Sequence, residues 1–560
     1  MIKEIYQIKS KEYLNVLKKV TSIEELSGNL HGMAEGCYSN LIPYYNHFLD
    51  QFPRLKSSIL KDLLLDSTIN NDEHIYGLLY NLTTNTLSLA KNIILGLDDS
   101  PSNFMLIRAI VENGLILKLF TEKDIDSKYI KLFKHHYCLF DYQFEVQYHQ
   151  KIHGMKISDG VDMNKRKAVR NFKDLFDIET DEEAQRIYSN RHGWAYKLVS
   201  DKPFVSFKDI VDFYGDEFEK SAYDLMSLLV HPHLQDIPLK SSWVKSTLFY
   251  AQRIIYKVSE KLGVKFEVAK ESFFVSEYQK IINHPNNVLN QIEEMYEKQV
   301  NLLSEMQFLV NQGRVNEYHN VLIRNLKNFY MDTYADYALG FSEVLRAKFK
   351  YMIEELAFNR YMYYRYFYEK DRFRLELIRE HYELRRLEKI DTEEFKDKVK
   401  GFKEKYEEVY QKKISMKKFI KNYIHQSYGF NINKKGNYTG ITQFIKNQIN
   451  LLFEKNKRIG EDIIALFEEV NSLGHASMYQ YYSDYSNQSD AIKGTVNLID
   501  ISTYHILEYL MLEYFIFGES DEDDKLKSIF KELETRLKQF NQISKDKIDL
   551  ITSTHSIIIH

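Results

Sequence analysis

The chain has 560 residues, of which 44% are hydrophobic and 14% aromatic, so it is too long for one core and too apolar for a disordered protein. Its formal net charge of −4 excludes an overall basic field that would attract nucleic acid or a membrane, so any such contact must be local. Two cysteines, Cys37 and Cys138, exclude a disulfide framework and a cysteine-based zinc site.

Residues that break helices are rare in this sequence. There are 7 prolines and 21 glycines, and no proline follows Pro285. Long apolar patterns with a helical period run between them, and no run alternates like a strand. The sequence therefore predicts an all-α protein. The first 20 residues have neither a signal peptide nor an anchor pattern, and the apolar stretch from Ile506 to Phe517 is interrupted by glutamates, so we expect a cytoplasmic protein that does not contact the membrane.

The predicted elements begin with short helices in residues 1–70, followed by a long helix from Asp72 to Leu97. The turn DDSPSN then stops this helix and supplies the cap of the next one, from Phe104 to Phe120. That helix is apolar on every side except for Arg108, Glu112 and Asn113, which predicts that it is buried and that these polar groups need partners.

The elements that follow alternate between helices and polar connections. We expect one long helix over residues 128–154, a polar crossover from Met155 to Asp177, and a helix opened by a capping box at Thr180 and Glu183. After an irregular loop, Ser206 and Asp209 resemble the cap of a helix that continues through DIVDFYGDEF. A further helix ends at His231, because Pro232 prevents easy continuation, and the segment from Trp243 to Leu262 closes this unit.

One stretch of the sequence occurs twice. In SAYDLMSLLVHPHLQ, Ser227 and His231 correspond to Ser472 and His475 of EEVNSLGHASMYQ, about 245 positions later. Other landmarks repeat at a similar offset, for example FTEKD at residues 120–124 and FYEKD at residues 367–371. This predicts two tandem, diverged helical-bundle repeats joined by a long helix. The expected boundaries are an N-terminal segment 1–70, repeat 1 at 71–262, a connector and long helix 263–310, repeat 2 at 311–517, and a C-terminal helix and tail 518–560.

Arg108 and Glu112 form the first candidate site. They lie one turn apart on the apolar helix, where a charge pair is stabilised only by good hydrogen bonds. Arg108 would bind an anion such as phosphate, with Glu112 orienting it; the alternative is a buried ion pair that only fixes packing. In the second copy the corresponding positions fall near Glu354, Glu355 and Asn359, so the arginine is not reproduced.

Ser227 and His231 form the second candidate site, with Tyr223 one turn before Ser227. A serine–histidine pair can activate a nucleophile, but two residues one turn apart on a helix have poor attacking geometry, and no acid is placed to orient the imidazole. His231 is then a general base, a group that contacts RNA, or a buried helix end.

These features together resemble a bacterial all-helical family of unknown function. The resemblance rests on R-x3-E in an apolar helix, Gly193–Trp194 in a loop, and Y-x3-S-x3-H-P from Tyr223 to Pro232. That family is similar to abortive-infection and HEPN-type proteins, many of which are metal-independent ribonucleases. The resemblance implies a bacterial antiphage defence protein of the abortive-infection type that acts on RNA.

The HEPN ribonuclease pattern places a histidine four to six residues after an arginine. Arg186 with His192 and Arg314 with His319 both fit it, and the resemblance implies that the histidine acts as acid and base while the arginine holds the scissile phosphate. Neither arginine is followed by the polar residue that is typical of this motif, since Ile187 and Val315 stand there. The alternative is that both pairs are ordinary helix-surface residues.

A basic cluster is the candidate contact for nucleic acid. It lies in NKRKAVRNFK, and an acidic segment that would neutralise it follows within a few residues. The aromatic run from Tyr361 to Tyr368 could stack bases, although such density is more typical of a core. His149 and His153 have metal-ligand spacing without a third ligand, so neither a metal nor a cofactor is predicted. The residues of the basic cluster are Lys165, Arg166, Lys167, Arg170 and Lys173.

The partner is expected to be RNA or a phage-derived protein, and long helices rich in aromatic residues favour a homodimer or larger homo-oligomer. If the protein is an enzyme, it is a metal-independent ribonuclease. The alternative is a non-catalytic helical scaffold or sensor that binds a protein partner, in which serine and histidine residues only cap helices.

Overall fold

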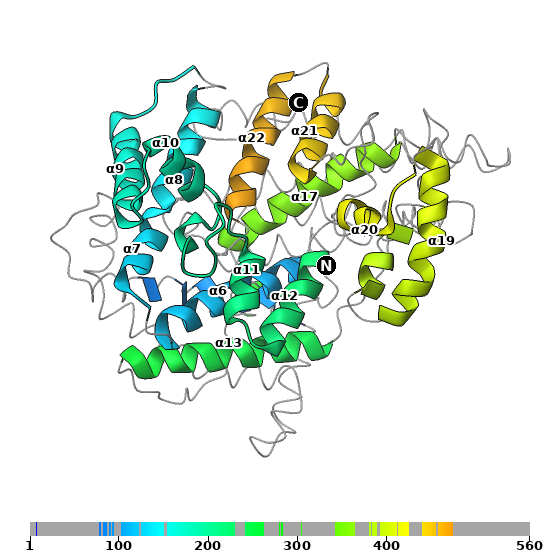
Figure 1. Ribbon diagram of the computed structural model, residues 1–560, viewed down its shortest axis with the longest axis horizontal. Helices are drawn as coiled ribbons and strands as arrows, with labels where there is room; N and C mark the ends of the chain where they lie inside the picture. The colour runs from blue at the N-terminus through cyan, green and yellow to red at the C-terminus, as the bar shows by residue number, and fades with distance from the viewer. Residues whose placement is uncertain are drawn as a thin grey trace, which may run out of the picture.

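The computed structural model describes the parts of the chain that carry the helical core (Figure 1). Within these residues the secondary structure is helical and contains no strand, which confirms the all-α prediction. We refer to the described residues up to 262 as the first half and to those from 342 as the second half. The described ranges are 102–122, 125–150, 154–229, 241–262, 342–363, 383–388, 392–410, 413–424, 440–454 and 457–473, with single positions or pairs at 7, 78–79, 82–83, 85–86, 89–90, 92–93, 279, 282–283, 304 and 380–381.

Helix α6 (Ser102–Glu122) is the core of the first half. As its sequence predicts, its apolar residues are buried on all sides, and Asn113 donates a hydrogen bond to Asn85 at 2.7 Å. Helices α12 (Glu217–Leu229) and α13 (Ser241–Leu262) pack against it. Burial of α6 on every side explains why its few charged side chains must find partners inside the protein.

A buried carboxylate ties α6, α12 and α13 together. Glu219 is fully buried on α12, where it accepts hydrogen bonds from Lys118 at 2.9 Å and from the hydroxyl of Tyr250 at 2.7 Å. Gly114 allows α13 to approach, because a Cβ atom there would lie 2.5 Å from the Tyr250 ring. These contacts fix the three helices around one satisfied polar group.

The segment before α12 contains two departures from the predicted elements. The long helix expected over residues 128–154 is broken at His136 into α7 (Ser127–His135) and α8 (Tyr137–Phe144), followed by the π-helical turn η1 (Glu145–Gln150). The expected polar crossover is instead helix α9 (Asp159–Leu175). Its narrow apolar stripe of Ala168, Val169 and Phe172 is buried, whereas the charged residues that dominate its composition line the opposite face.

The predicted helix starts are confirmed. Thr180 caps α10 (Asp181–Tyr188) by accepting a hydrogen bond from the backbone N–H of Glu183, without the return bond from Glu183 that would complete the predicted capping box. Ser206 with Asp209 forms a complete capping box on α11 (Phe207–Tyr214). However, α11 ends at Tyr214, with Gly215 as its C-cap, so the helix does not continue through DIVDFYGDEF as predicted. At the start of α12, the backbone N–H groups of Asp216 and Glu219 each donate a hydrogen bond to the side-chain carboxylate of the other, which forms a second capping box that was not predicted from the sequence.

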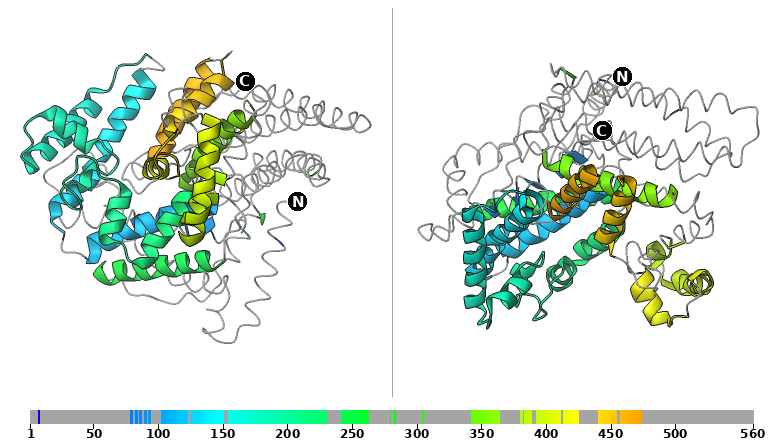
Figure 2. Two further views of the ribbon diagram at one scale, coloured as in Figure 1. Left: turned by 45° about the vertical axis from the view of Figure 1, so that its right-hand side comes forward. Right: turned by 90° about the horizontal axis from the view of Figure 1, so that it is seen from above.

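The second half is organised around α17 (Ser342–Tyr363), which packs against α21 (Ile441–Leu452) and α22 (Lys457–Leu473). Helix α17 also contacts α6, and the view from above in Figure 2 shows the two lying against each other at the centre of the molecule. A smaller group, made of α19 (Thr392–Tyr410), α20 (Met416–Phe419) and the π-helical turn η5 (Ile420–Ile424), lies to one side.

One histidine–tyrosine contact occurs in similar form in each half. Nε2 of His136 lies 2.7 Å from the carbonyl oxygen of Tyr188, and Nε2 of His381 lies 2.8 Å from that of Tyr423. In each case the histidine ring also packs against the tyrosine ring. His136 and His381 are 245 positions apart, the same spacing as Ser227 and Ser472. A duplicated helical unit would produce this likeness, but the tandem repeat remains a prediction.

Several predictions lie outside the described residues. These are the elements of residues 1–70, the long helix of the connector, the segment 518–560, and the histidines at positions 153, 231, 319 and 475. Of the aromatic run, Tyr361 is described, and it is a buried core residue that packs on Phe444. None of the described helices has the length and apolar character needed to cross a membrane.

Candidate functional site

Arg108 and Glu112 form a buried ion pair on α6, as their spacing predicts. Nε of Arg108 donates a hydrogen bond to Glu112 at 2.9 Å, and the guanidinium also donates to the Tyr223 hydroxyl at 3.4 Å while lying 5.1 Å from the centre of that ring. Burial acts to lower the pKa of Arg108, but Tyr223 and Glu112 outweigh it and raise that pKa above its ordinary value. Arg108 therefore remains charged.

The loop after α10 brings Arg191 and His192 beside this pair. Gly193 allows the loop to turn back, because a Cβ atom there would lie 2.4 Å from the carbonyl oxygen of Ile187. His192 is buried edge-on against Phe207, and burial, with the nearby charge of Arg191, lowers its pKa to about 3. Burial and the charge of Arg108 lower the pKa of Arg191 to about 10. Neighbouring positive charges thus contribute to the lowered pKa values of both Arg191 and His192.

The second half contributes Lys350 and Glu354 from α17. Burial is the main cause that lowers the pKa of Lys350 to about 8; Arg108 and Arg191 lower it further, whereas Glu354 and Glu112 act in the opposite direction. The side chains of α6 and α17 therefore share one electrostatic environment. We call this set the central charge cluster, and its members are Arg108, Glu112, Arg191, His192, Tyr223, Lys350 and Glu354.

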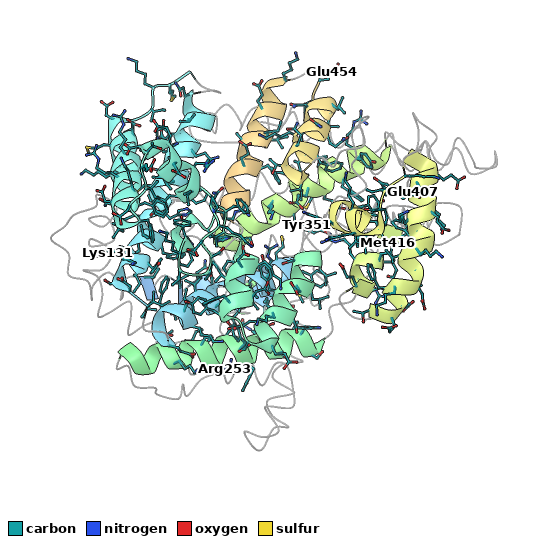
Figure 3. All side chains as sticks on the ribbon, in the orientation of Figure 1. Lys131, Arg253, Tyr351, Glu407, Met416 and Glu454 are labelled. Atoms are coloured by element: carbon teal, nitrogen blue, oxygen red, sulfur yellow. The ribbon has the colours of Figure 1, made fainter. Side chains whose placement is uncertain are left out.

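Lys350 and Glu354 have the same spacing as Arg108 and Glu112. The second-copy positions expected from the sequence, near Glu354, Glu355 and Asn359, include the glutamate of this pair but not Lys350. A search for a lysine in place of the arginine, with the glutamate one turn later, would have found the pair. Figure 3 labels Tyr351, the next residue on α17, in the middle of the molecule, whereas Lys131 and Arg253 lie near its edge.

Glu355 is a second unusual carboxyl group on α17. It is buried, and neither of its oxygens has a hydrogen-bond partner within the described part of the chain. Burial and the charge of Glu354 raise its pKa to about 8. Glu355 is consequently protonated at neutral pH and adds no charge to this part of the protein.

The two candidate histidine pairs have different outcomes. Ser227 lies one turn after Tyr223 on the partly buried face of α12, and its hydroxyl is among the groups that influence the pKa of Tyr223, but His231 lies outside the described residues. Arg186 is exposed on α10, 3.7 Å from Glu183, while His192 is buried. The fold therefore places His192 near Arg191 and Arg108, and not with Arg186 as the predicted pair required.

The predicted nucleic-acid contacts lie along α9. Lys165 packs over the ring of Tyr142 at 4.4 Å, and Lys173 makes an ion pair with Asp181 at 2.9 Å. Arg166 also has an acidic partner, Asp162, whereas Lys167 and Arg170 are exposed. Acidic and aromatic neighbours already contact much of this basic face, so it is a weaker candidate than the central charge cluster.

Within the described residues, no group of three histidine, cysteine or acidic side chains is placed to hold a metal ion. Comparison of the chain with protein-family models, curated proteins and solved structures found no match. The chemistry of the central charge cluster is therefore the main guide to function.

Proposed function

We propose that this protein is a cytoplasmic bacterial antiphage defence protein of the abortive-infection type, which binds a phosphate group of RNA at the central charge cluster. The observation that carries the proposal is the gathering of Arg108, Arg191 and Lys350 in one place, where burial, and then the neighbouring positive charges, lower the pKa values of Arg191 and Lys350. An anion placed among these cations would offset both their desolvation and their mutual repulsion.

Guanidinium groups support a phosphate ligand in particular. A planar guanidinium presents several N–H donors that match phosphate oxygens in pairs. Arg191 is the cluster member suited to this role, because it is only partly buried. Arg108 would then act at longer range, since Glu112 and Tyr223 already accept its hydrogen bonds.

The protonation of His192 bears on whether the protein is a ribonuclease. With a pKa of about 3, its imidazole is neutral throughout the physiological range and is a poor proton donor in this conformation. His192 would instead position the ligand through a hydrogen bond. Binding followed by signalling is therefore better supported than RNA cleavage at this site.

The non-catalytic scaffold remains the second proposal. It is favoured by the completeness of the contacts between Arg108, Glu112 and Tyr223, which need no ligand to satisfy them. In that case the cluster only joins the two halves, and the partner is a phage-derived protein bound elsewhere. The homo-oligomeric state predicted from the sequence is compatible with either proposal.

The test is a phage challenge of bacteria that express the wild-type protein, Arg191→Gln, Arg186→Gln or His192→Gln, with survival and total RNA integrity followed together. Arg186→Gln is the matched control, because Arg186 is exposed and outside the cluster. We expect protection to disappear with Arg191→Gln but not with Arg186→Gln, in protein that is still folded by circular dichroism. Equal protection by these two variants would favour the scaffold, and RNA cleavage that requires His192 would restore the nuclease.

A further inference from the structure

Two nitrogen groups at the central charge cluster have no hydrogen-bond partner within the described residues. Lys350 is 6% exposed, and within the described part of the chain its ammonium group makes neither a hydrogen bond nor an ion pair. His192 is 3% exposed, and its Nδ1 atom has no hydrogen-bond partner. Burying polar groups without partners is unfavourable, so such groups often mark the place of a bound ligand.

We propose that the crossing of α6 and α17 is a composite binding site for a phosphate monoester, in which Lys350 of the second half completes the set of donors begun by Arg191 and His192 of the first half. This inference rests on the proposed function and deepens it by naming the ligand class. It also assigns a binding role to the second half, which would otherwise be only a structural copy of the first.

The charge of the site fits an anion. The cluster contains three basic side chains, Arg108, Arg191 and Lys350, and two carboxyl groups, Glu112 and Glu354, so its formal charge is positive. Charge-assisted hydrogen bonds from lysine and arginine to phosphate are among the strongest in proteins. A bound anion would also favour the protonated form of Lys350.

Burial favours a terminal phosphate over one inside an RNA strand. Arg108 is 9% exposed, and Glu112 and Glu354 are fully buried. An internal phosphodiester would have to carry nucleotides on both sides into the core between α6 and α17. A phosphate monoester has only one substituent, so its phosphate can enter past the partly buried Arg191 while the rest of the ligand stays outside.

The experiment uses the purified full chain with inorganic phosphate and then adenosine 5′-monophosphate as probes. Binding is measured by calorimetry and by the melting temperature, against chloride at equal ionic strength. Lys350→Met removes the ammonium group at similar volume, and Lys167→Met removes an exposed lysine of α9 as the matched control. If Lys350→Met fails to fold, Lys350→Gln, which keeps a polar side chain without the charge, gives the same test.

We expect both probes to raise the melting temperature of the wild type and of Lys167→Met. Affinity should fall about tenfold or more in Lys350→Met, the scale for losing one charge-assisted hydrogen bond. Wild-type binding should also weaken as the pH rises from 7 to 9, because Lys350 then loses its proton. Equal binding by Lys350→Met and the wild type, or no binding by the wild type, would overturn the composite site.

A second arm separates monoester recognition from general RNA binding. Two short RNAs of one sequence are compared, one with a 5′-phosphate and one with a 5′-hydroxyl. We expect tighter binding of the phosphorylated RNA, with the difference lost in Lys350→Met, and equal affinities would overturn the monoester assignment. Phage protection that depends on Arg191 but survives Lys350→Met would remove the composite site while leaving the defence role in place.

Discussion

Arg108 and Lys350 lie at matching places in the two halves, yet their environments differ. Each stands one turn before a buried glutamate on the central helix of its half, and the two helices contact each other. Arg108 donates hydrogen bonds to Glu112 and to Tyr223, whereas Lys350 makes no such bond within the described residues. The same spacing therefore gives a satisfied structural pair in the first half and an unsatisfied cation in the second.

The chemistry of the two side chains accounts for part of this difference. A guanidinium has five N–H donors in a fixed plane, so Arg108 can reach Glu112 along α6 and Tyr223 on α12 at once. The lysine ammonium group is compact and is strongly hydrated in water, so burial without partners lowers its pKa. A lysine thus suits a position that is filled only when a ligand arrives.

The largest expected effect comes from removing each cation in turn. Arg108→Met leaves Glu112 buried without its ion pair and should lower the free energy of unfolding by about 3–5 kcal/mol. Lys350→Met removes a buried charge that lacks a partner and should change it by no more than about 1 kcal/mol. Melting temperatures of the two variants in phosphate-free buffer test the contrast. Equal losses would mean that Lys350 is also structural.

Much of the first half could be predicted from the sequence. The apolar character of α6 indicated its burial and required partners for Arg108 and Glu112, and the caps at Thr180 and Ser206 depend only on local spacing. Each of these features is decided within a few residues of chain. That is why they could be predicted without knowledge of the tertiary contacts.

The features that were missed depend on contacts between distant segments. The predicted helix breaks at His136, and Nε2 of this histidine makes hydrogen bonds with the carbonyl groups of Tyr188 and Asn190, more than 50 residues away. Arg191 lies in a loop whose path to α6 has no sequence signature. Lys350 was overlooked because the search required an arginine, although the helix spacing itself was preserved.

The next effect is a loss of stability in acid that should arise in the first half. Burial lowers the pKa of His136 to about 4 and that of His192 to about 3, whereas both imidazoles of the unfolded chain titrate near 6.5. The unfolded state therefore binds more protons between these values, and stability falls as the pH drops below 6.5, by about 1.4 kcal/mol per pH unit for each histidine.

His192→Gln should reduce that slope by about half, because it leaves only His136 of the pair. The measurement is the midpoint of urea unfolding at several pH values between 7 and 4.5 for the wild type and the variant. A control with an exposed group, Glu183→Gln, should follow the wild type. An unchanged slope in His192→Gln would show that His192 is already accessible to protons in the folded state.

Alanine substitutions at two glycines would compare how closely a helix of each half is packed. Gly114→Ala on α6 places a methyl group against Tyr250, which is buried and held by Glu219, and should lower the free energy of unfolding by about 1–3 kcal/mol. Gly401→Ala on α19 meets no atom within 4 Å and should raise it by up to about 1 kcal/mol. Opposite shifts in melting temperature would confirm the difference, and two losses would show that α19 is covered.

The smallest effect compares two helix starts. Ser206 caps α11, since its hydroxyl accepts a hydrogen bond from the backbone N–H of Asp209 at 3.2 Å, and the Asp209 carboxylate accepts one from the backbone N–H of Ser206 at 2.8 Å. Ser415, in contrast, precedes α20 without a side-chain cap. Ser206→Ala should therefore lower the free energy of unfolding by about 1 kcal/mol, and Ser415→Ala by only a few tenths. Hydrogen exchange at the first backbone amides of each helix measures this locally. Faster exchange after Ser206→Ala, with little change after Ser415→Ala, would show that the first half depends on local caps as well as on the central charge cluster.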